Sequence, residues 1–510
     1  MHRKNHWDHI VVGAGAAGCA IAMRLSKERG RSVLLLEAGP DYPDTTKIPK
    51  DLKNGKRNSL LKHDWGFTHK TNSMQKVDFM LPRGKVVGGS SAVNTCIALR
   101  GIPEDYDEWA DLGLKEWSWD KCLPAFKKLE ADQDFNDEYH NQTGPMTIRR
   151  HKPEELVPWQ AAFLEACDEL GYPKCDDHNN PNTTGAGPHA MNKVNGVRFS
   201  AAMGYLTPAV RSRANLTIQP HTLAHRVLFY NGQAIGIEVE CKGEIQTFFS
   251  ENIIISCGSI ATPGLLLRSG IGAKNDIYRL GVSLVSDVPG VGSRLLDHPG
   301  AAFFMMPRPG IAKRHDPLIQ TLLRYTSEPG AFPNDMQIQP GSCLTLPWMN
   351  ITAVTMMTCV EKTKGVGKIH WNSAWPHAKP IVESNILDHP EDRRLAVDGL
   401  SRAYELTQSK AMRKLAVPIL PMGKILKDKR KLDEWIRIYS DSGYHPCGTV
   451  PMGVDSDPMA ALDEYCRVRG TKGLIVADAS IFPTVPSVNI HLPTIMVGER
   501  VADFILSGTI

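Results

Sequence analysis

The sequence predicts a mixed α/β protein of more than one domain, with one Rossmann-like dinucleotide-binding domain. Three observations lead to this fold class. A buried strand, a helix and a second buried strand follow one another over residues 10–36. Glycines at the first turn have the spacing of a nucleotide-binding loop. The chain has 510 residues, which is more than a single hydrophobic core usually organises.

The first unit is read element by element. Residues 10–12 (Ile-Val-Val) are a short β-branched run, which is typical of a buried strand. Residues 13–18 follow as Gly-Ala-Gly-Ala-Ala-Gly. A helix is predicted over residues 19–29, ended by Gly30. Residues 33–36 (Val-Leu-Leu-Leu) predict a second buried strand.

Each motif residue has a physical reason to be there. Gly13 permits the tight turn, Gly15 allows a pyrophosphate to approach the backbone, and Gly18 allows the helix to pack closely on the strand. The helix N-terminus offers unpaired N–H groups to an anion. Glu37 lies 19 residues after Gly18, where an acid accepts hydrogen bonds from a ribose diol. The motif predicts a dinucleotide site without choosing between FAD and NAD.

The composition excludes several classes of protein. Lys and Arg total 59 against 55 Asp and Glu, so a net charge of +4 gives no nucleic-acid-binding field. The 11 cysteines include no CxxC pair, which argues against a disulfide framework and against a zinc site, so we expect no metal. No apolar run is long enough for a transmembrane segment. The basic start of the chain resembles a signal peptide only weakly, because the glycine motif follows it. We expect a cytoplasmic location.

Further motifs identify a family resemblance. They lie at 81–107 (LPRGKVVGGSSAVNTCIALRGIPEDYD), 258–272 (GSIATPGLLLRSGIG), 444–453 (YHPCGTVPMG), 476–483 (VADASIFP) and 488–494 (VNIHLPT). With these segments, the sequence resembles the glucose–methanol–choline (GMC) family of FAD-dependent oxidoreductases from about residue 7 to residue 506. The resemblance is weakest over 310–440.

The resemblance implies a domain division and a cofactor. A discontinuous FAD-binding domain would comprise residues 1–150, 220–305 and 440–510. A substrate domain, with an antiparallel sheet backed by helices, would comprise 151–219 and 306–439. The cofactor would be FAD.

The residues that match the family's cofactor site lie in three groups. The first motif contributes Gly13, Gly15, Ala16, Ala17, Gly18, Glu37 and Ala38. A second loop, a backbone nest for phosphate or flavin, contributes Gly84, Val87, Gly88, Ser91, Asn94 and Thr95. Later segments contribute Ala224 against adenine, Asp478 and Ala479 near the ribityl and diphosphate, and Thr494 near the flavin pyrimidine edge. Some family members link flavin to a histidine where this chain has Val93, so we expect FAD to be bound non-covalently.

Two histidines match the family's active-site positions. His445 matches the active-site histidine, and His491 matches a position that is histidine in some members and asparagine in others. Histidine has an ordinary pKa of about 6.5, whereas that of an alcohol is close to water's value of about 15.7. The gap corresponds to about 12 kcal/mol, so a free alkoxide is out of reach. Proton removal must therefore be coupled to hydride loss or assisted by a second donor.

Other polar and aromatic residues receive weaker interpretations. Asp297-His298 resembles half of a catalytic dyad, but a structural loop near the cofactor is the favoured interpretation. Trp348, Trp371, Trp375 and His377 are candidates for a pocket in the variable region, with core packing an equally good alternative.

Three functions remain open from the sequence. The favoured one is an FAD-dependent alcohol oxidase or dehydrogenase that acts on a small-molecule alcohol and passes electrons to oxygen or to a quinone or protein acceptor. The second is a lyase on the same scaffold that cleaves cyanohydrins without net redox chemistry. The third is an FAD-binding interaction module without turnover. The sequence names neither the alcohol nor the oligomeric state.

Overall fold

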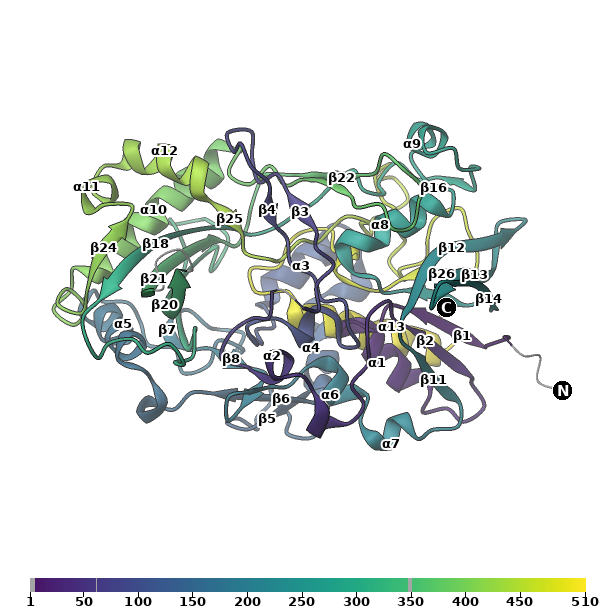
Figure 1. Cartoon of the computed structure of the whole chain (residues 1–510), viewed down its shortest axis with the longest axis horizontal. Coiled ribbons are helices and arrows are strands. Elements are labelled where there is room, and N and C mark those ends of the chain that lie inside the picture. The colour runs from purple at the N-terminus through teal and green to yellow at the C-terminus, as the bar shows by residue number, and fades with distance from the viewer. Residues whose placement is uncertain (1–4, 61, 347–350) are drawn as a thin grey trace.

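A five-stranded parallel sheet forms the centre of one half of the molecule (Figure 1, right). The computed structural model describes residues 5–60, 62–346 and 351–510. The strand order is β11 (Leu216–Gln219), β2 (Val33–Leu36), β1 (His9–Val12), β15 (Ile253–Ile255) and β26 (Leu474–Val476). The three central strands are fully buried, which explains their continuous apolar sequences.

The first helix, α1, starts earlier than expected. It spans Ala16–Leu25, whereas the sequence predicted residues 19–29 with Gly30 as its end. It begins inside the glycine motif, so its N-terminus faces the phosphate-binding turn. Ser26 caps its end, and Arg213 donates hydrogen bonds to the Met23 carbonyl and the Ser26 hydroxyl. These partners satisfy the terminal groups before Gly30 is reached.

The last helix of the chain packs against this first one. α13 (His491–Leu506) contacts α1 so closely that a Cβ on Gly498 would lie 2.8 Å from the Cα of Ala17. Glu499 ties the pair together, because it accepts hydrogen bonds from Arg24 on α1 and from Tyr205. The start of α13 is thereby fixed beside the glycine motif.

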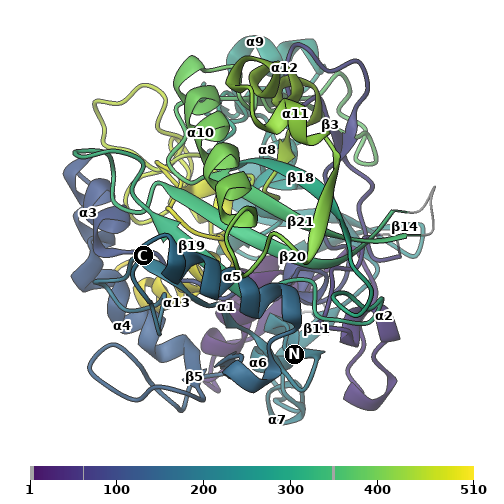
Figure 2. The same cartoon turned by 90° about the vertical axis from the view of Figure 1, so that its left-hand side faces the viewer.

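The other half of the molecule is built on a large antiparallel sheet (Figure 1, left). Its order is β24 (Ala416–Leu420), β18 (Pro299–Pro307), β21 (Ile351–Val360), β20 (Met336–Leu346), β19 (Thr321–Tyr325) and β7 (Gly185–Pro188), with β25 (Asp441–Ser442) also paired to β18. Helices α5 (Pro158–Glu169) and α10 (Pro390–Thr407) cover the face turned away from the parallel sheet (Figure 2), and α12 (Lys429–Tyr439) packs against α10.

Alternation along β18 divides its side chains between two faces. Ala301, Phe303 and Met305 are buried in the core formed with the helices. Ala302 and Phe304 line a cavity on the opposite face. The antiparallel sheet therefore serves as one wall of that cavity.

The remaining elements connect these two sheets or extend them. A three-stranded antiparallel sheet consists of β12 (Thr222–Tyr230), β13 (Gln233–Cys241) and β14 (Glu244–Phe249). The other elements are η1 (Thr45–Lys47), α2 (Lys50–Lys53), β3 (Thr68–His69), β4 (Phe79–Met80), η2 (Gly89–Ala92), α3 (Pro103–Asp111), η3 (Lys115–Trp117), α4 (Trp119–Leu129), β5 (Glu130–Asp132), β6 (Met146–Arg150), η4 (Pro153–Glu155), β8 (Ala190–Met191), β9 (Lys193–Val194), β10 (Val197–Arg198), α6 (Ala201–Tyr205), α7 (Pro208–Arg211), α8 (Gly258–Arg268), β16 (Ile271–Gly272), α9 (Lys274–Arg279), β17 (Ser286–Asp287), β22 (Lys368–His370), β23 (Ile381–Glu383), α11 (Gly423–Leu426) and η5 (Ala479–Ile481).

This architecture is the mixed α/β fold that the sequence predicts. The domain boundaries stay a prediction; β11 lies just before the expected boundary at 219/220 yet joins the parallel sheet. Across residues 5–60, 62–346 and 351–510, no helix combines the length and the apolar character needed to cross a membrane.

Candidate active site

A cavity of about 890 Å³ lies between the two halves of the molecule. It runs from the first glycine motif to the antiparallel sheet and His445. Most residues of the predicted cofactor site line it: Gly13, Gly15, Ala16, Ala17, Glu37, Ala38, Gly84, Ser91, Asn94, Thr95, Ala224, Asp478, Ala479 and Thr494. Both predicted active-site histidines, His445 and His491, also line it. Gly18, Val87 and Gly88 do not, and lie behind the wall.

The glycines of the first motif differ in what surrounds them. Gly13 has a φ of +101°, and a Cβ there would lie 2.4 Å from the Ser256 carbonyl oxygen. A Cβ on Gly18 would lie 2.0 Å from the Gly13 carbonyl oxygen, so this glycine serves helix–strand packing. Gly15 is open by comparison, with its nearest neighbour 3.9 Å away. The open position is the one expected to receive a pyrophosphate.

A second glycine loop closes onto the first. The backbone N–H of Gly88 donates to the Ala14 carbonyl at 2.7 Å. A Cβ on Gly89 would lie 2.7 Å from the Cα of Gly15. Both Gly88 and Gly89 have positive φ values, which favour glycine. The two loops thus form one continuous backbone surface with no side chain between them.

Glu37 stands at the end of β2 and is buried. Its carboxylate accepts hydrogen bonds from the backbone N–H groups of Ala14 at 3.1 Å and Gly39 at 2.9 Å. Burial raises its pKa to about 7, while those two N–H groups act in the opposite direction. Glu37 therefore anchors the glycine turn and leaves acceptor positions for a ribose diol.

Two other predicted cofactor residues hold the protein's own backbone. Asp478 accepts hydrogen bonds from the Gly258 N–H at 2.8 Å and the Thr262 hydroxyl at 2.6 Å. Ser91 donates to the Gly88 carbonyl and accepts from the Ala201 N–H. These residues shape the cavity wall, so their contact with a bound dinucleotide stays a prediction.

The cavity suits an extended dinucleotide. It offers a ribose acceptor at Glu37, a side-chain-free backbone at Gly15 and Gly89, and a helix N-terminus at Ala16. At its far end it reaches His445, where a redox-active ring would meet the antiparallel sheet. The residues present therefore fit FAD.

Strand pairing brings two histidines together at that end. β18 begins at Pro299, which pairs with Ser442 of β25. His298 and His445 lie just outside this ladder, and their Nδ1 atoms are 2.9 Å apart. Tyr444 adopts a positive φ of 65°, which turns the chain at this point.

Hydrogen bonds assign the tautomer of each ring. His298 Nε2 lies 2.9 Å from the Pro486 carbonyl oxygen, which only accepts, so Nε2 carries the proton. Burial lowers the pKa of His298 to about 3, so the ring is neutral and its Nδ1 accepts. His445 must then donate from Nδ1, which leaves a lone pair on its Nε2.

That lone pair has a polar neighbour. The Asn489 side-chain amide lies 2.9 Å from His445 Nε2 and donates to it. Burial, followed by the nearby His298 and Arg83, lowers the pKa of His445 well below its ordinary value. His445 is therefore in its basic form at neutral pH.

His491 is the first residue of α13 and lines the same cavity. Its Nε2 is buried and has no hydrogen-bond partner among the residues that the structure describes. Burial lowers its pKa to about 4, so this ring is also neutral. A buried ring nitrogen without a partner is suited to bind a ligand oxygen.

Asp297 fixes the loop that carries His445. Its carboxylate accepts from the His445 backbone N–H at 3.0 Å and the Ser442 hydroxyl at 2.5 Å. Burial raises its pKa to about 6. The sequence favoured a structural loop for Asp297-His298; the structure adds that both residues contact His445 directly.

The aromatic candidates of the variable region lie elsewhere. Trp371 is buried against Gly264, and Trp375 is exposed. His377 contacts Glu240, away from the residues that line the cavity. Trp348 lies outside the described residues. The substrate half is lined instead by β18, β20, β21 and α12. The apolar residues of β18 and β21 gave no signal of which strand face would be open.

Sequence comparisons match the whole chain. Two models described as GMC oxidoreductase match residues 7–300 and 363–498. An oxygen-dependent choline dehydrogenase from Photobacterium profundum is 33% identical over 99% of this chain and 93% of its own length. Human mitochondrial choline dehydrogenase is 33% identical over 98% of this chain and 90% of its own length.

Solved structures of other proteins share the fold of this chain. Pyridoxine 4-oxidase from Mesorbium loti superimposes with a TM-score of 0.89 at 26% identity, covering 98% of each chain. A formate oxidase superimposes with a TM-score of 0.90 over 100% of this chain and 99% of its own, at 22% identity, which supports the fold alone. The chain therefore belongs to the GMC oxidoreductase family, and its cofactor is FAD.

Proposed function

We propose that the protein oxidises an alcohol to an aldehyde or ketone, with His445 as the general base. The observation that carries this proposal is the assigned tautomer of His445, because it leaves a lone pair on Nε2 among the residues that line the cavity. FAD, when bound, supplies the hydride acceptor. The chain's own task is to take the proton from the alcohol oxygen.

The lowered pKa of His445 shapes how that proton moves. A neutral imidazole is always ready to accept, but its conjugate acid is costly in a buried site. The gap of about 12 kcal/mol to a free alkoxide grows when the base is weaker. Proton transfer to Nε2 must therefore accompany the breaking of the C–H bond.

Two further groups are placed to bind the alcohol oxygen. His491 presents a buried Nε2 that can donate a hydrogen bond if it carries the proton. Asn489 donates an amide N–H to the single lone pair of His445 Nε2, so the alcohol must displace it to reach the base, and the freed amide can then donate to the alcohol oxygen. Donors aimed at a developing negative charge lower the barrier by several kcal/mol, typically about 2.7–4 for one such group.

The substrate half of the cavity supports a largely apolar alcohol. Ala302, Phe304, Leu344 and Met357 line it from the antiparallel sheet, with Trp435 from α12. We propose that the non-reacting part of the substrate is aromatic or aliphatic and uncharged. Among the described residues, the carboxylate that lines the substrate half is Asp441. It already forms hydrogen bonds with His69 at 3.0 Å and with the Tyr444 hydroxyl at 3.1 Å.

Residues 1–4, 61 and 347–350 add no carboxylate. Leu61, Pro347, Trp348, Met349 and Asn350 carry no charge, and residues 1–4 include no acid. A quaternary ammonium group would meet aromatic rings, which attract cations, but only one carboxylate among the described residues there, and that carboxylate is already hydrogen-bonded; the preference for a neutral substrate therefore rests on Asp441. Relatives named as choline dehydrogenases support alcohol oxidation, while the lining supports a neutral substrate.

Anaerobic flavin reduction tests the reaction. A panel of alcohols is mixed with the oxidised protein under nitrogen, and bleaching of the flavin identifies substrates. The lyase alternative predicts product without bleaching. For an active alcohol, His445→Ala should slow reduction by about 10²- to 10⁴-fold, the usual effect of a positioned base. Reduction at the wild-type rate would place the base elsewhere.

A pair of nearly isosteric alcohols tests the substrate class. Choline and 3,3-dimethylbutan-1-ol differ in a positive nitrogen against a neutral carbon. We expect the neutral alcohol to reduce the flavin with the higher kcat/KM, and the reverse order would overturn the neutral-substrate proposal without affecting the reaction. Repeating the turnover in air, with hydrogen peroxide measured, tests oxygen as the acceptor; the relatives named oxygen-dependent support that choice.

A further inference from the structure

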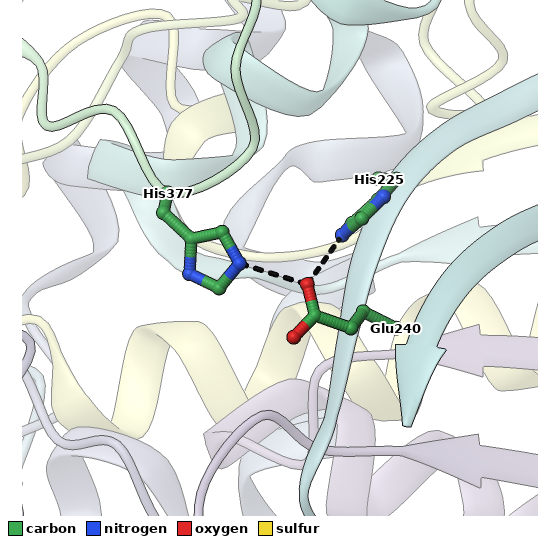
Figure 3. Close-up of side chains that lie close together, drawn as sticks. All are labelled: His225, Glu240 and His377. Carbon is green, nitrogen blue, oxygen red and sulfur yellow. Dashed lines mark hydrogen bonds and ion pairs between the residues drawn. The ribbon is translucent and has the colours of Figure 1, made fainter. Parts of the chain in front are cut away.

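Two histidines and a glutamate converge at the edge of the three-stranded sheet, outside the active site (Figure 3). Glu240 Oε2 lies 3.3 Å from His225 Nε2 and 2.8 Å from His377 Nε2. The three ligand atoms all lie within 4.8 Å of one another. Figure 3 shows both imidazole rings directed at the same carboxylate oxygen.

The backbone is shaped to produce this convergence. His225 and Glu240 come from neighbouring strands, β12 and β13. The ladder between these strands shifts register between Ala224 and Arg226, so His225 is the extra residue of a β-bulge. A bulge re-aims a side chain that regular alternation would direct elsewhere. His377 reaches the same point from the segment 371–380, between β22 and β23.

The spacing suits a tetrahedral transition-metal ion. Bonds of about 2.0–2.1 Å in a tetrahedron place neighbouring ligand atoms about 3.4 Å apart. The 3.3 Å distance from His225 to Glu240 is close to that value, whereas the 2.8 Å distance from His377 is shorter, so His377 would move slightly outward to admit the ion. Two imidazoles with one carboxylate are ligands that Zn²⁺ accepts, whereas Ca²⁺ and Mg²⁺ prefer oxygen alone.

The protonation state also permits metal binding. In the described part of the chain, neither ring makes a hydrogen bond through Nδ1. Each ring can therefore carry its proton on Nδ1 and free Nε2 for the ion.

We propose that His225, Glu240 and His377 bind one Zn²⁺ ion, with water in the fourth position. The ion would clamp the segment 371–380 onto the β12–β13 hairpin. The same hairpin carries Leu223 and Ala224, which line the adenine end of the cofactor cavity. Arg268 joins the two sides, because it lines the cavity and donates to the His225 carbonyl at 2.8 Å. The site is thus a structural clamp on the outer side of the cofactor wall.

Titration of untagged, chelator-treated holoenzyme with Zn²⁺ tests the site. Isothermal titration calorimetry should give one ion per chain. His377→Ala and Glu240→Gln should each weaken binding by more than about 100-fold, because losing an outer-shell partner alone costs about 10- to 100-fold. His315→Ala, an exposed histidine outside the cluster, is the matched control and should bind as the wild type does.

Hydrogen–deuterium exchange supplies an independent readout. Zn²⁺ should slow exchange in peptides covering 371–380 in the wild type and in His315→Ala, but not in His377→Ala. His377 lies in an exposed segment, so its loss leaves the fold intact. Absence of stoichiometric binding by the wild type, or equal affinity in His377→Ala and Glu240→Gln, would overturn the proposal. In that case the three side chains form only a hydrogen-bonded cluster.

Discussion

Replacement of His298 tests whether a neighbouring ring sets the tautomer of His445. In His298→Ala, the Nδ1–H of His445 loses its acceptor at 2.9 Å in a buried site. Loss of a buried partner costs about 1–3 kcal/mol. At 1.36 kcal/mol per tenfold change in rate, that corresponds to about 5- to 150-fold slower flavin reduction.

A conservative variant separates this effect from simple loss of packing. His298→Asn can place its Oδ1 close to the position of the imidazole Nδ1 and still accept from His445. We therefore expect His298→Asn to recover most of the rate that His298→Ala loses.

Stopped-flow spectroscopy under nitrogen measures the limiting rate of flavin reduction and the apparent substrate affinity. The affinity should change little, since His298 does not line the cavity. The flavin spectrum and Tm of each variant check that cofactor and fold are retained. Wild-type reduction by a folded His298→Ala would show that Pro486 and His298 do not control the base. Equal rates for the Ala and Asn variants would show that the acceptor is not what matters.

Three further predictions concern the cofactor and stability. Glu37→Ala should weaken FAD binding by about 10- to 150-fold, since a hydrogen bond to a charged group contributes about 1.5–3 kcal/mol; fluorescence titration of the apoprotein would detect an unchanged affinity. Acid should release all flavin into the supernatant, because Val93 cannot form a covalent link; flavin that stays with the precipitate would contradict this. Burial lowers the pKa of His178 and of His298 to about 3 in the folded protein. In the unfolded chain the same rings have a pKa of about 6.5, so below pH 6.5 the unfolded state binds more protons and the free energy of unfolding falls as the pH falls. Each ring should cost about 2 kcal/mol at pH 5, and so should His9, His151 and His491, whose pKa values burial lowers to about 4, 3 and 4. The raised pKa values of Asp297, Glu37 and Glu361 act in the opposite direction and offset part of this loss; a Tm at pH 5 equal to that at pH 7 would refute the reasoning.

The nucleotide-binding half could be predicted because its signals are local. The second strand was expected at 33–36 and lies there, since a buried parallel strand is a continuous apolar run. The helix that precedes it was misplaced at both ends. Its start was hidden in the glycine motif, and its end depends on Arg213, a residue far along the chain.

The contacts around the base could not be predicted because they are set by distant pairing. His298 and His445 are 147 residues apart and meet through β25, a strand of only two residues that no periodicity reveals. Asn489 was part of a recognised motif, but nothing local indicates that its amide reaches His445. The substrate wall was also hidden, because β18 is apolar on both faces and the pattern does not tell core from cavity.

The close packing of α13 on α1 has a consequence for how the protein matures. The phosphate-binding turn is synthesised before β26, Asn489 and His491. Until residues 474–506 have left the ribosome, the parallel sheet lacks its edge strand and the glycine motif lacks the helix that packs against it. Stable cofactor loading therefore has to follow the synthesis of residues 474–506, and a chain cut short before residue 474 would be left as an incomplete sheet for the cell's quality control to remove.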